Sequence, residues 1–303
     1  PDISLAKGAG LKIGSRGGIA VDENNLTSDK SIYALGDAAE KTDELDESST
    51  LVPLANIANR HGRVIADHIN NRKTRHVNTI GTAIVKVFDL AVAVTGWNEK
   101  RLKAAGMKHR AIHTHPGSHA GYYPGAETLS LKLLINPDNG EIFGAQGVGK
   151  DGVDKRIDVI ATAMRGKITA PELADLELAY APPFGSAKDP VNMLGYIAEN
   201  VLSGLTEIAQ WNELDNYKSS GYEFIDVRSP SEYANGTIPN SVNIPVDELR
   251  ERYKEIKGNY NVTEASQDAI ALADKLSWNQ FHVIGHSMTG MVAQRIALDA
   301  TSR

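Results

Sequence analysis

Two short segments near the start of the chain carry residue types that could hold a ligand. Gly36 and Asp37 follow the short apolar run 32–35, and Leu54 and Ala55 open a stretch with helical spacing. Glycine lets a backbone approach a ligand closely, a carboxylate accepts hydrogen bonds, and the free N–H groups of a helix start attract electron-rich acceptors. We therefore predict a binding site where a buried strand, residues 32–35, meets the helix start. A strand, turn and helix without a ligand is the alternative.

Thiol chemistry is excluded, because the 303 residues contain no cysteine. Disulfides, thiolate metal sites and cysteine nucleophiles are excluded with it. A net charge of -6 gives no electrostatic basis for binding nucleic acid or an anionic membrane. No apolar run approaches the length of a membrane span, so we expect no membrane partner and a cytoplasmic location. The opening residues, which lack a methionine, are expected to come from within a longer reading frame.

The elements that position these residues follow from periodicity. Apolar spacing predicts helices at 54–70, 154–165 and 190–202, and alternation predicts strands at 82–88, 91–95 and 129–135. Asp138-Asn139-Gly140 is typical of a hairpin turn. Ser203-Gly204 is a plausible linker, and a smaller α/β unit with strands near 222–227, 241–244 and 281–285 follows it.

Two further patterns suggest chemistry that we do not favour. Gly147-Val148-Gly149-Lys150-Asp151-Gly152 fits a dinucleotide-binding glycine pattern, but a single match is weak. Four histidines, His109, His113, His115 and His119, lie close together, but their spacing matches no common zinc pattern. We expect a polar loop there and no metal site.

The motifs of the first 200 residues resemble one family. Residues 31–37, together with residues 54–62, resemble the second FAD-contacting segment of the pyridine nucleotide-disulfide oxidoreductases. That resemblance implies FAD as cofactor, with Gly36, Asp37, Leu54 and Ala55 as contacts. We expect the chain not to retain FAD, because the glycine-rich turn that receives its pyrophosphate is not in this sequence. Val153-Asp154-Lys155-Arg156, which follows the glycine pattern at residues 147–152, resembles the dimerisation domain of this family.

Two tyrosine segments narrow the subgroup. Residues 118–126 and 178–184 are similar to those of coenzyme A-disulfide and persulfide reductases, in which a tyrosine of each segment reaches the partner subunit's thiol site. We carry that role to Tyr123 (or its neighbour Tyr122) and to Tyr180. A phenol suits it, because it can donate to a thiolate without a change of charge near neutrality. Two tyrosines that only pack a dimer interface are the alternative.

The carboxy-terminal third resembles two further families. Residues 208–257 resemble the first half of a rhodanese domain, with Thr237 where histidine is usual. From residue 258 onward the chain resembles an α/β-hydrolase, with Ser287 in a nucleophile elbow at residues 285–290. A serine without a base is a poor nucleophile, and the triad's acid and histidine would have to lie beyond Arg303. We therefore expect Ser287 to be inactive.

These resemblances define the expected architecture: a chimeric α/β and α+β chain. Residues 1–78 form the carboxy-terminal segment of an FAD-binding domain, residues 79–203 an α+β dimerisation domain, residues 208–257 a partial rhodanese-like parallel α/β unit, and residues 258–303 a hydrolase-like fragment. The family passes hydride from NAD(P)H through FAD to a disulfide or persulfide, so a fragment of such an enzyme, inactive as given, is expected. A homodimer and a coenzyme A-type disulfide or persulfide substrate are implied. A non-catalytic dimerisation module and a serine hydrolase are the alternatives.

Overall fold

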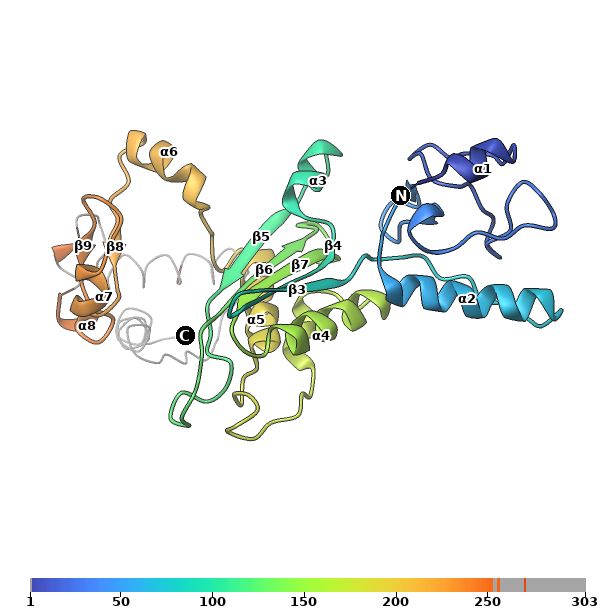
Figure 1. Ribbon diagram of the computed structural model, residues 1–303. Helices are drawn as coiled ribbons and strands as arrows, with labels where there is room; N and C mark the ends of the chain where they lie inside the picture. Colours follow the sequence, from blue (N-terminus) through green and yellow to red (C-terminus); the bar gives the residue numbers. More distant parts are fainter. Residues whose placement is uncertain (1, 253–254, 257–269, 271–303) are drawn as a thin grey trace. The chain divides into compact units, whose positions relative to one another are not determined.

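The chain divides into two compact units, residues 1–208 and 209–303. The computed structural model describes residues 2–252, 255–256 and 270 (Figure 1). No helix among these residues is long and apolar enough to cross a membrane.

The first unit begins with short elements and one long helix. These are α1 (Ser4–Gly8), the 3-10 helix η1 (Gly36–Ala38), the antiparallel strands β1 (Lys41–Thr42) and β2 (Ser49–Thr50), and α2 (Ala55–Ile69). The helix predicted at 54–70 is thereby confirmed. Ile57 and Ile65 lie on its buried face, two turns apart, as a 3.6-residue period requires.

The prediction of a buried strand at residues 32–35 is wrong. Within the described residues this run makes only an isolated bridge between Tyr33 and Leu26, and Ile32 and Leu35 are 37% and 42% exposed. An apolar run becomes a buried strand only where neighbouring strands pair with its backbone and other elements cover its faces. Here neither condition is met, and the run leads into η1 as an extended segment.

A five-stranded antiparallel sheet forms the centre of the first unit, in the order β3-β4-β7-β6-β5. Its strands are β3 (Ala83–Val87), β4 (Leu90–Gly96), β5 (Arg110–Thr114), β6 (Leu129–Ile135) and β7 (Ile142–Gly149). The three predicted strands are confirmed, and so is the turn at Asp138-Asn139-Gly140, which joins the paired strands β6 and β7. Strand β5 contains His113, so the expected polar loop is wrong at that position, whereas His109, His115 and His119 lie outside the strands.

Helices α4 (Val153–Arg165) and α5 (Pro190–Leu202), both at their predicted positions, pack on one face of this sheet (Figure 1). Alternate β6 residues Leu129, Leu131 and Leu133 are fully buried against them. The short helix η2 (Pro171–Asp175) packs on α5. Helix α3 (Glu99–Ala104) contributes Leu102 to a smaller cluster that contains Leu134 of the opposite face. Because side chains alternate along a strand, one sheet serves two clusters.

The second unit contains η3 (Trp211–Glu213), α6 (Leu214–Ser219), β8 (Ile225–Asp226), α7 (Pro230–Ala234), β9 (Val242–Asn243) and α8 (Leu249–Arg252). Strands β8 and β9 are parallel, which confirms two of the predicted strands in shorter form. The strand predicted at 281–285 and the hydrolase-like segment with Ser287 lie outside the described residues.

Candidate functional site

The start of α2 has unused hydrogen-bond donors. Its N-cap residue is Leu54, which offers no side-chain acceptor, whereas helices usually begin with Ser, Thr, Asp or Asn. Within the described part of the chain, the backbone N–H groups of Ala55 and Asn56 therefore have no partner, whereas that of Ile57 donates to the oxygen of Leu54 at 3.2 Å; the positive end of the helix dipole lies there. Such a helix end suits an electron-rich acceptor, and the pyrimidine edge of a flavin is one example.

Gly36 and Asp37 lie beside this helix. Element η1 packs against α2, and a Cβ added to Gly36 would lie 3.9 Å from the Cβ of Ala58. Gly36 has φ of +76°, a conformation that favours glycine, and Asp37 is exposed. The structure thus brings the two predicted cofactor-contacting segments together. The donor groups of the helix and the carboxylate of Asp37 fit the isoalloxazine ring and the polyol of a flavin.

A buried lysine braces the turn that carries Asp37. Lys41 is 6% exposed, and its ammonium group donates to the backbone oxygens of Gly36 (2.5 Å) and Ala39 (2.8 Å). Burial lowers the pKa of Lys41, and the charge of Asp37 opposes that shift. Burial, together with the charges of Lys41 and Arg60, also lowers the pKa of His61 to about 4. Backbone oxygens are present at every residue, so no sequence pattern indicates that Lys41 binds those of Gly36 and Ala39.

The two predicted tyrosine segments meet in the structure. The hydroxyl groups of Tyr122 and Tyr180 lie 3.2 Å apart, although 58 residues separate them. The hydrogen bond with Tyr122 raises the pKa of Tyr180. Tyr123 instead contacts the ring of His119 edge-on, at 5.7 Å between centroids. Of the two neighbouring tyrosines, it is therefore Tyr122 that pairs with Tyr180.

Both phenols are open to a ligand. Tyr122 is 78% exposed and Tyr180 is 47% exposed, while the residues that begin the first loop, Ser118 and His119, are buried. The backbone N–H of Ala120 donates to the oxygen of Gly185 at 2.9 Å and joins the two loops. The arrangement presents two adjacent hydroxyl groups on a rigid base, and each can donate to a sulfur anion or carbonyl oxygen.

The glycines at 147, 149 and 152 serve packing. Added Cβ atoms at Gly147 and Gly149 would approach Val153 to 3.0 Å and 3.3 Å, so these glycines let α4 lie close to β7. Gly152 has φ of +70°, and its Cβ would lie 2.2 Å from a guanidinium nitrogen of Arg156. Within the described part of the chain, no group of three or more His, Asp or Glu residues has the arrangement of a metal site.

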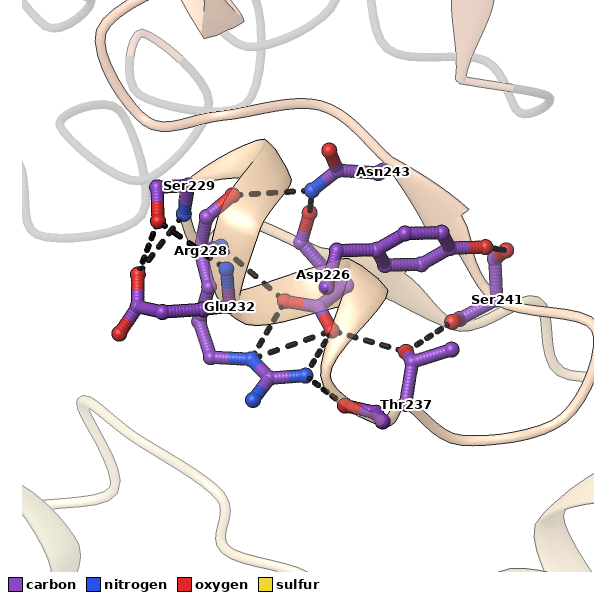
Figure 2. Close-up of polar contacts among 9 residues, drawn as sticks. Asp226, Arg228, Ser229, Glu232, Thr237, Ser241 and Asn243 are labelled. Carbon is purple, nitrogen blue, oxygen red and sulfur yellow. Dashed lines mark hydrogen bonds and ion pairs between the residues drawn. The ribbon is translucent and has the colours of Figure 1, made fainter.

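In the second unit, polar side chains converge on Asp226 at the end of β8 (Figure 2). Arg228 binds this carboxylate through Nε and Nη2, and Thr237 donates to it from Oγ1 at 2.8 Å. Thr237 also lies 2.7 Å from the hydroxyl of Ser241. The hydrogen bonds of Arg228 are the main cause that lowers the pKa of Asp226. Thr237, which stands where histidine is usual, thus connects the carboxylate of Asp226 to the hydroxyl of Ser241 through hydrogen bonds.

Three family models match successive segments of the chain. Residues 1–62 match the family model "Pyridine nucleotide-disulphide oxidoreductase", residues 82–190 match its dimerisation domain, and residues 209–297 match the rhodanese-like domain. The rhodanese match includes the segment that holds Ser287; the predicted hydrolase-like fragment there stays a prediction.

Curated relatives point to the same subgroup. The chain is 36% identical to the coenzyme A disulfide reductase of Staphylococcus aureus (strain JH9) over 200 residues, which are 66% of this chain and 45% of the relative. It is 36% identical to that of Staphylococcus haemolyticus over 202 residues, 66% of this chain and 46% of the relative. The chain thus spans about half the length of the relatives that it matches.

Solved structures give the same result. The crystal structure of reduced Bacillus anthracis CoADR-RHD matches with a TM-score of 0.82 and 45% identity, over 100% of this chain and 51% of that one. The NAD-dependent persulfide reductase from A. fulgidus matches with a TM-score of 0.79 and 38% identity, over 91% of this chain and 51% of that one. The chain is therefore similar to coenzyme A disulfide reductases over about two thirds of its length, and it contains matches to a pyridine nucleotide-disulphide oxidoreductase segment, to the dimerisation domain of that family and to a rhodanese-like domain, in that order.

Proposed function

We propose that this chain is the carboxy-terminal part of an FAD-dependent NAD(P)H:coenzyme A-disulfide or persulfide oxidoreductase. The observation that carries the proposal is the Tyr122–Tyr180 pair. The two segments that resemble the tyrosine segments of this subgroup are brought within 3.2 Å at their hydroxyl groups, on a domain that matches the family's dimerisation domain. The cytoplasmic location stays a prediction.

The proposed role of the first segment is to complete a flavin site. Asp37 would accept hydrogen bonds from the polyol chain, and the uncapped N–H groups at Ala55 would bind the pyrimidine edge. FAD, when bound, supplies the relay of a hydride from the nicotinamide to sulfur. Lys41 keeps the turn at Gly36 and Asp37 in one conformation through its two backbone bonds.

The proposed role of the tyrosine pair is to bind sulfur at a thiol site of the partner subunit in a homodimer, at a position to which this chain itself contributes no thiol. Two hydroxyl groups side by side can stabilise a thiolate as it leaves a disulfide, since hydrogen bonds to an anion are roughly twice as strong as those between neutral groups. The 303 residues hold no thiol, so these phenols would act on sulfur that the ligand or another polypeptide segment brings. A homodimer is part of this proposal.

The rhodanese-like unit is proposed to be without sulfurtransferase activity. The sulfur-carrying residue of a rhodanese is a cysteine, and this sequence has none. The intact network of Asp226, Arg228 and Thr237 serves to hold the loop of residues 227–241 in place.

A chimeric enzyme tests the proposed function. The part of the Bacillus anthracis relative that this chain does not cover is fused ahead of residues 1–208, and NAD(P)H-dependent reduction of coenzyme A disulfide is measured. We expect turnover in the chimera and a loss of at least about tenfold in the Tyr122→Phe/Tyr180→Phe variant, in keeping with the worth of charge-assisted hydrogen bonds. Tyr123→Phe is the matched control, with near-unchanged turnover. Equal rates in all three chimeras would contradict the proposed role.

A further inference from the structure

Arg156 is the most deeply buried charged side chain near the tyrosine pair. It lies on α4 and is 1% exposed. Its Nη2 donates to the backbone oxygen of Ser118 (2.9 Å) and to Oδ2 of Asp189 (2.9 Å), while Nε reaches Oδ1 of Asp189 at 3.3 Å and Nη1 reaches the oxygen of Gly152 at 3.1 Å. One side chain thus binds the start of the first tyrosine loop and the end of the second.

Short backbone segments and hydrogen bonds together form a path that links this side chain to both phenols. Beyond Ser118, the N–H of Ala120 donates to Gly185 of the other loop, and the N–H of Tyr123 returns to the oxygen of Ala120, which closes the turn that carries Tyr122. In the second loop, the N–H groups of Phe184 and Gly185 bind the oxygen of Ala181, the residue after Tyr180.

The far end of the path is anchored as firmly. Asp189 caps α5 by accepting from the N–H of Val191 at 3.0 Å, and its own N–H donates to Asn192. The amide of Asn192 in turn donates to the oxygens of Leu173 and Leu176, which precede Tyr180 in the chain. The second loop is therefore held at both of its ends.

We propose that Arg156, through Asp189 and the oxygen of Ser118, is a positioning residue that holds Tyr122 and Tyr180 at hydrogen-bonding distance. The catalytic use of the pair rests on the proposed function, but the positioning does not. An exposed pair of long loops would otherwise lose conformational freedom on pairing, and a pair of phenols in water offers little to offset that loss. The buried guanidinium, bound to both loops, orders them before any ligand arrives.

The experiment reads the hydrogen bond itself, in the full chain. Tyrosines are labelled with ¹³C at the ring carbon that bears the hydroxyl, and the signals of Tyr122 and Tyr180 are assigned with Tyr122→Phe and Tyr180→Phe. In the unmodified chain we expect Tyr180 to titrate above the ordinary pKa of about 10, and Tyr122→Phe to bring its midpoint down. The double variant Arg156→Met/Asp189→Asn should bring it down equally, because asparagine still caps α5 while the loops lose their common anchor.

Controls separate positioning from general stability. Leu194→Ala, a fully buried truncation in the same helix α5, destabilises the unit without touching the path, so the Tyr180 midpoint should stay high. Arg156→Lys, which retains the charge but not the fork of donors, should give an intermediate midpoint and serves if the double variant does not fold. An unshifted midpoint in every Arg156 variant, or an equal shift in Leu194→Ala, overturns the proposal. If the Tyr180 midpoint falls in the Arg156 variants while the chimera is inactive, the positioning role is supported and only the proposed reductase function is contradicted.

Discussion

Asp43 joins the segment that carries Asp37 and α2 to the sheet of the dimerisation domain, and its removal has a calculable effect. Asp43 is 5% exposed. Its carboxylate accepts the indole N–H of Trp97 at 3.0 Å and the backbone N–H of Leu45 at 2.9 Å, and it forms an ion pair with Arg101 at 2.9 Å. The guanidinium of Arg101 also lies over the Trp97 ring, 3.7 Å from its centroid.

The change Asp43→Ala should lower the free energy of unfolding of the first unit by about 2–3 kcal/mol. Trp97 is 4% exposed, so its buried N–H loses its acceptor, which costs about 1–3 kcal/mol. Arg101 is 35% exposed and recovers water, so the lost ion pair contributes only about 0–1 kcal/mol. The N–H of Leu45 lies in a half-buried turn and adds little.

Urea unfolding followed by Trp97 fluorescence measures this free energy, in a Trp211→Phe/Trp278→Phe background in which Trp97 is the single indole. Asp46→Ala is the matched control, because Asp46 lies in the same hairpin but is exposed, and among the described residues its carboxylate binds Ser48 alone. We expect Asp46→Ala to cost less than about 1 kcal/mol. In a Trp97→Phe chain, which has no indole N–H, the cost of Asp43→Ala should fall by at least about 1 kcal/mol when followed by circular dichroism. Equal costs at Asp43 and Asp46 would refute the reasoning.

Four further predictions follow from the same structure. The chain should self-associate through the faces that bear Tyr123 and Tyr180, and sedimentation that shows only monomer at tens of micromolar, an affinity limit of about -6 to -7 kcal/mol, would count against it. The purified chain should not retain FAD, which a flavin absorption band near one per chain would contradict. It should show neither labelling of Ser287 by a fluorophosphonate nor cyanide-dependent sulfurtransfer from thiosulfate, and either activity at an enzymatic rate would overturn this. The first unit should lose stability as pH falls from about 6.5 to about 4, because His61 is protonated in the unfolded chain over this range but not in the folded chain, where Asn25 binds its Nδ1. The urea midpoints of the unmodified chain and of His61→Phe, at pH 7 and at pH 5, measure this loss. An equal loss in both chains would exclude His61 as its source.

The sequence alone determined the elements whose signal is local. The helices α2, α4 and α5 repeat their apolar residues every three to four positions, and the turn at Asp138-Asn139-Gly140 needs a glycine with positive φ, so both can be recognised without knowledge of the rest of the chain. The tyrosine segments were found through their resemblance to a family, which depends on consecutive residues.

Only the tertiary structure decided which distant groups meet. The run 32–35 is apolar, but whether it becomes a strand depends on partners that no local pattern encodes. Strand β5 was missed because His113 within it, and His109 and His115 on either side, obscure the alternation of a strand. That Tyr122 rather than Tyr123 pairs with Tyr180 depends on the turn closed at Ala120. Arg156 has the appearance of an ordinary helix residue in the sequence. Its importance comes from burial and from partners 33 and 38 residues away, which only the packing of α4 against both loops brings within reach.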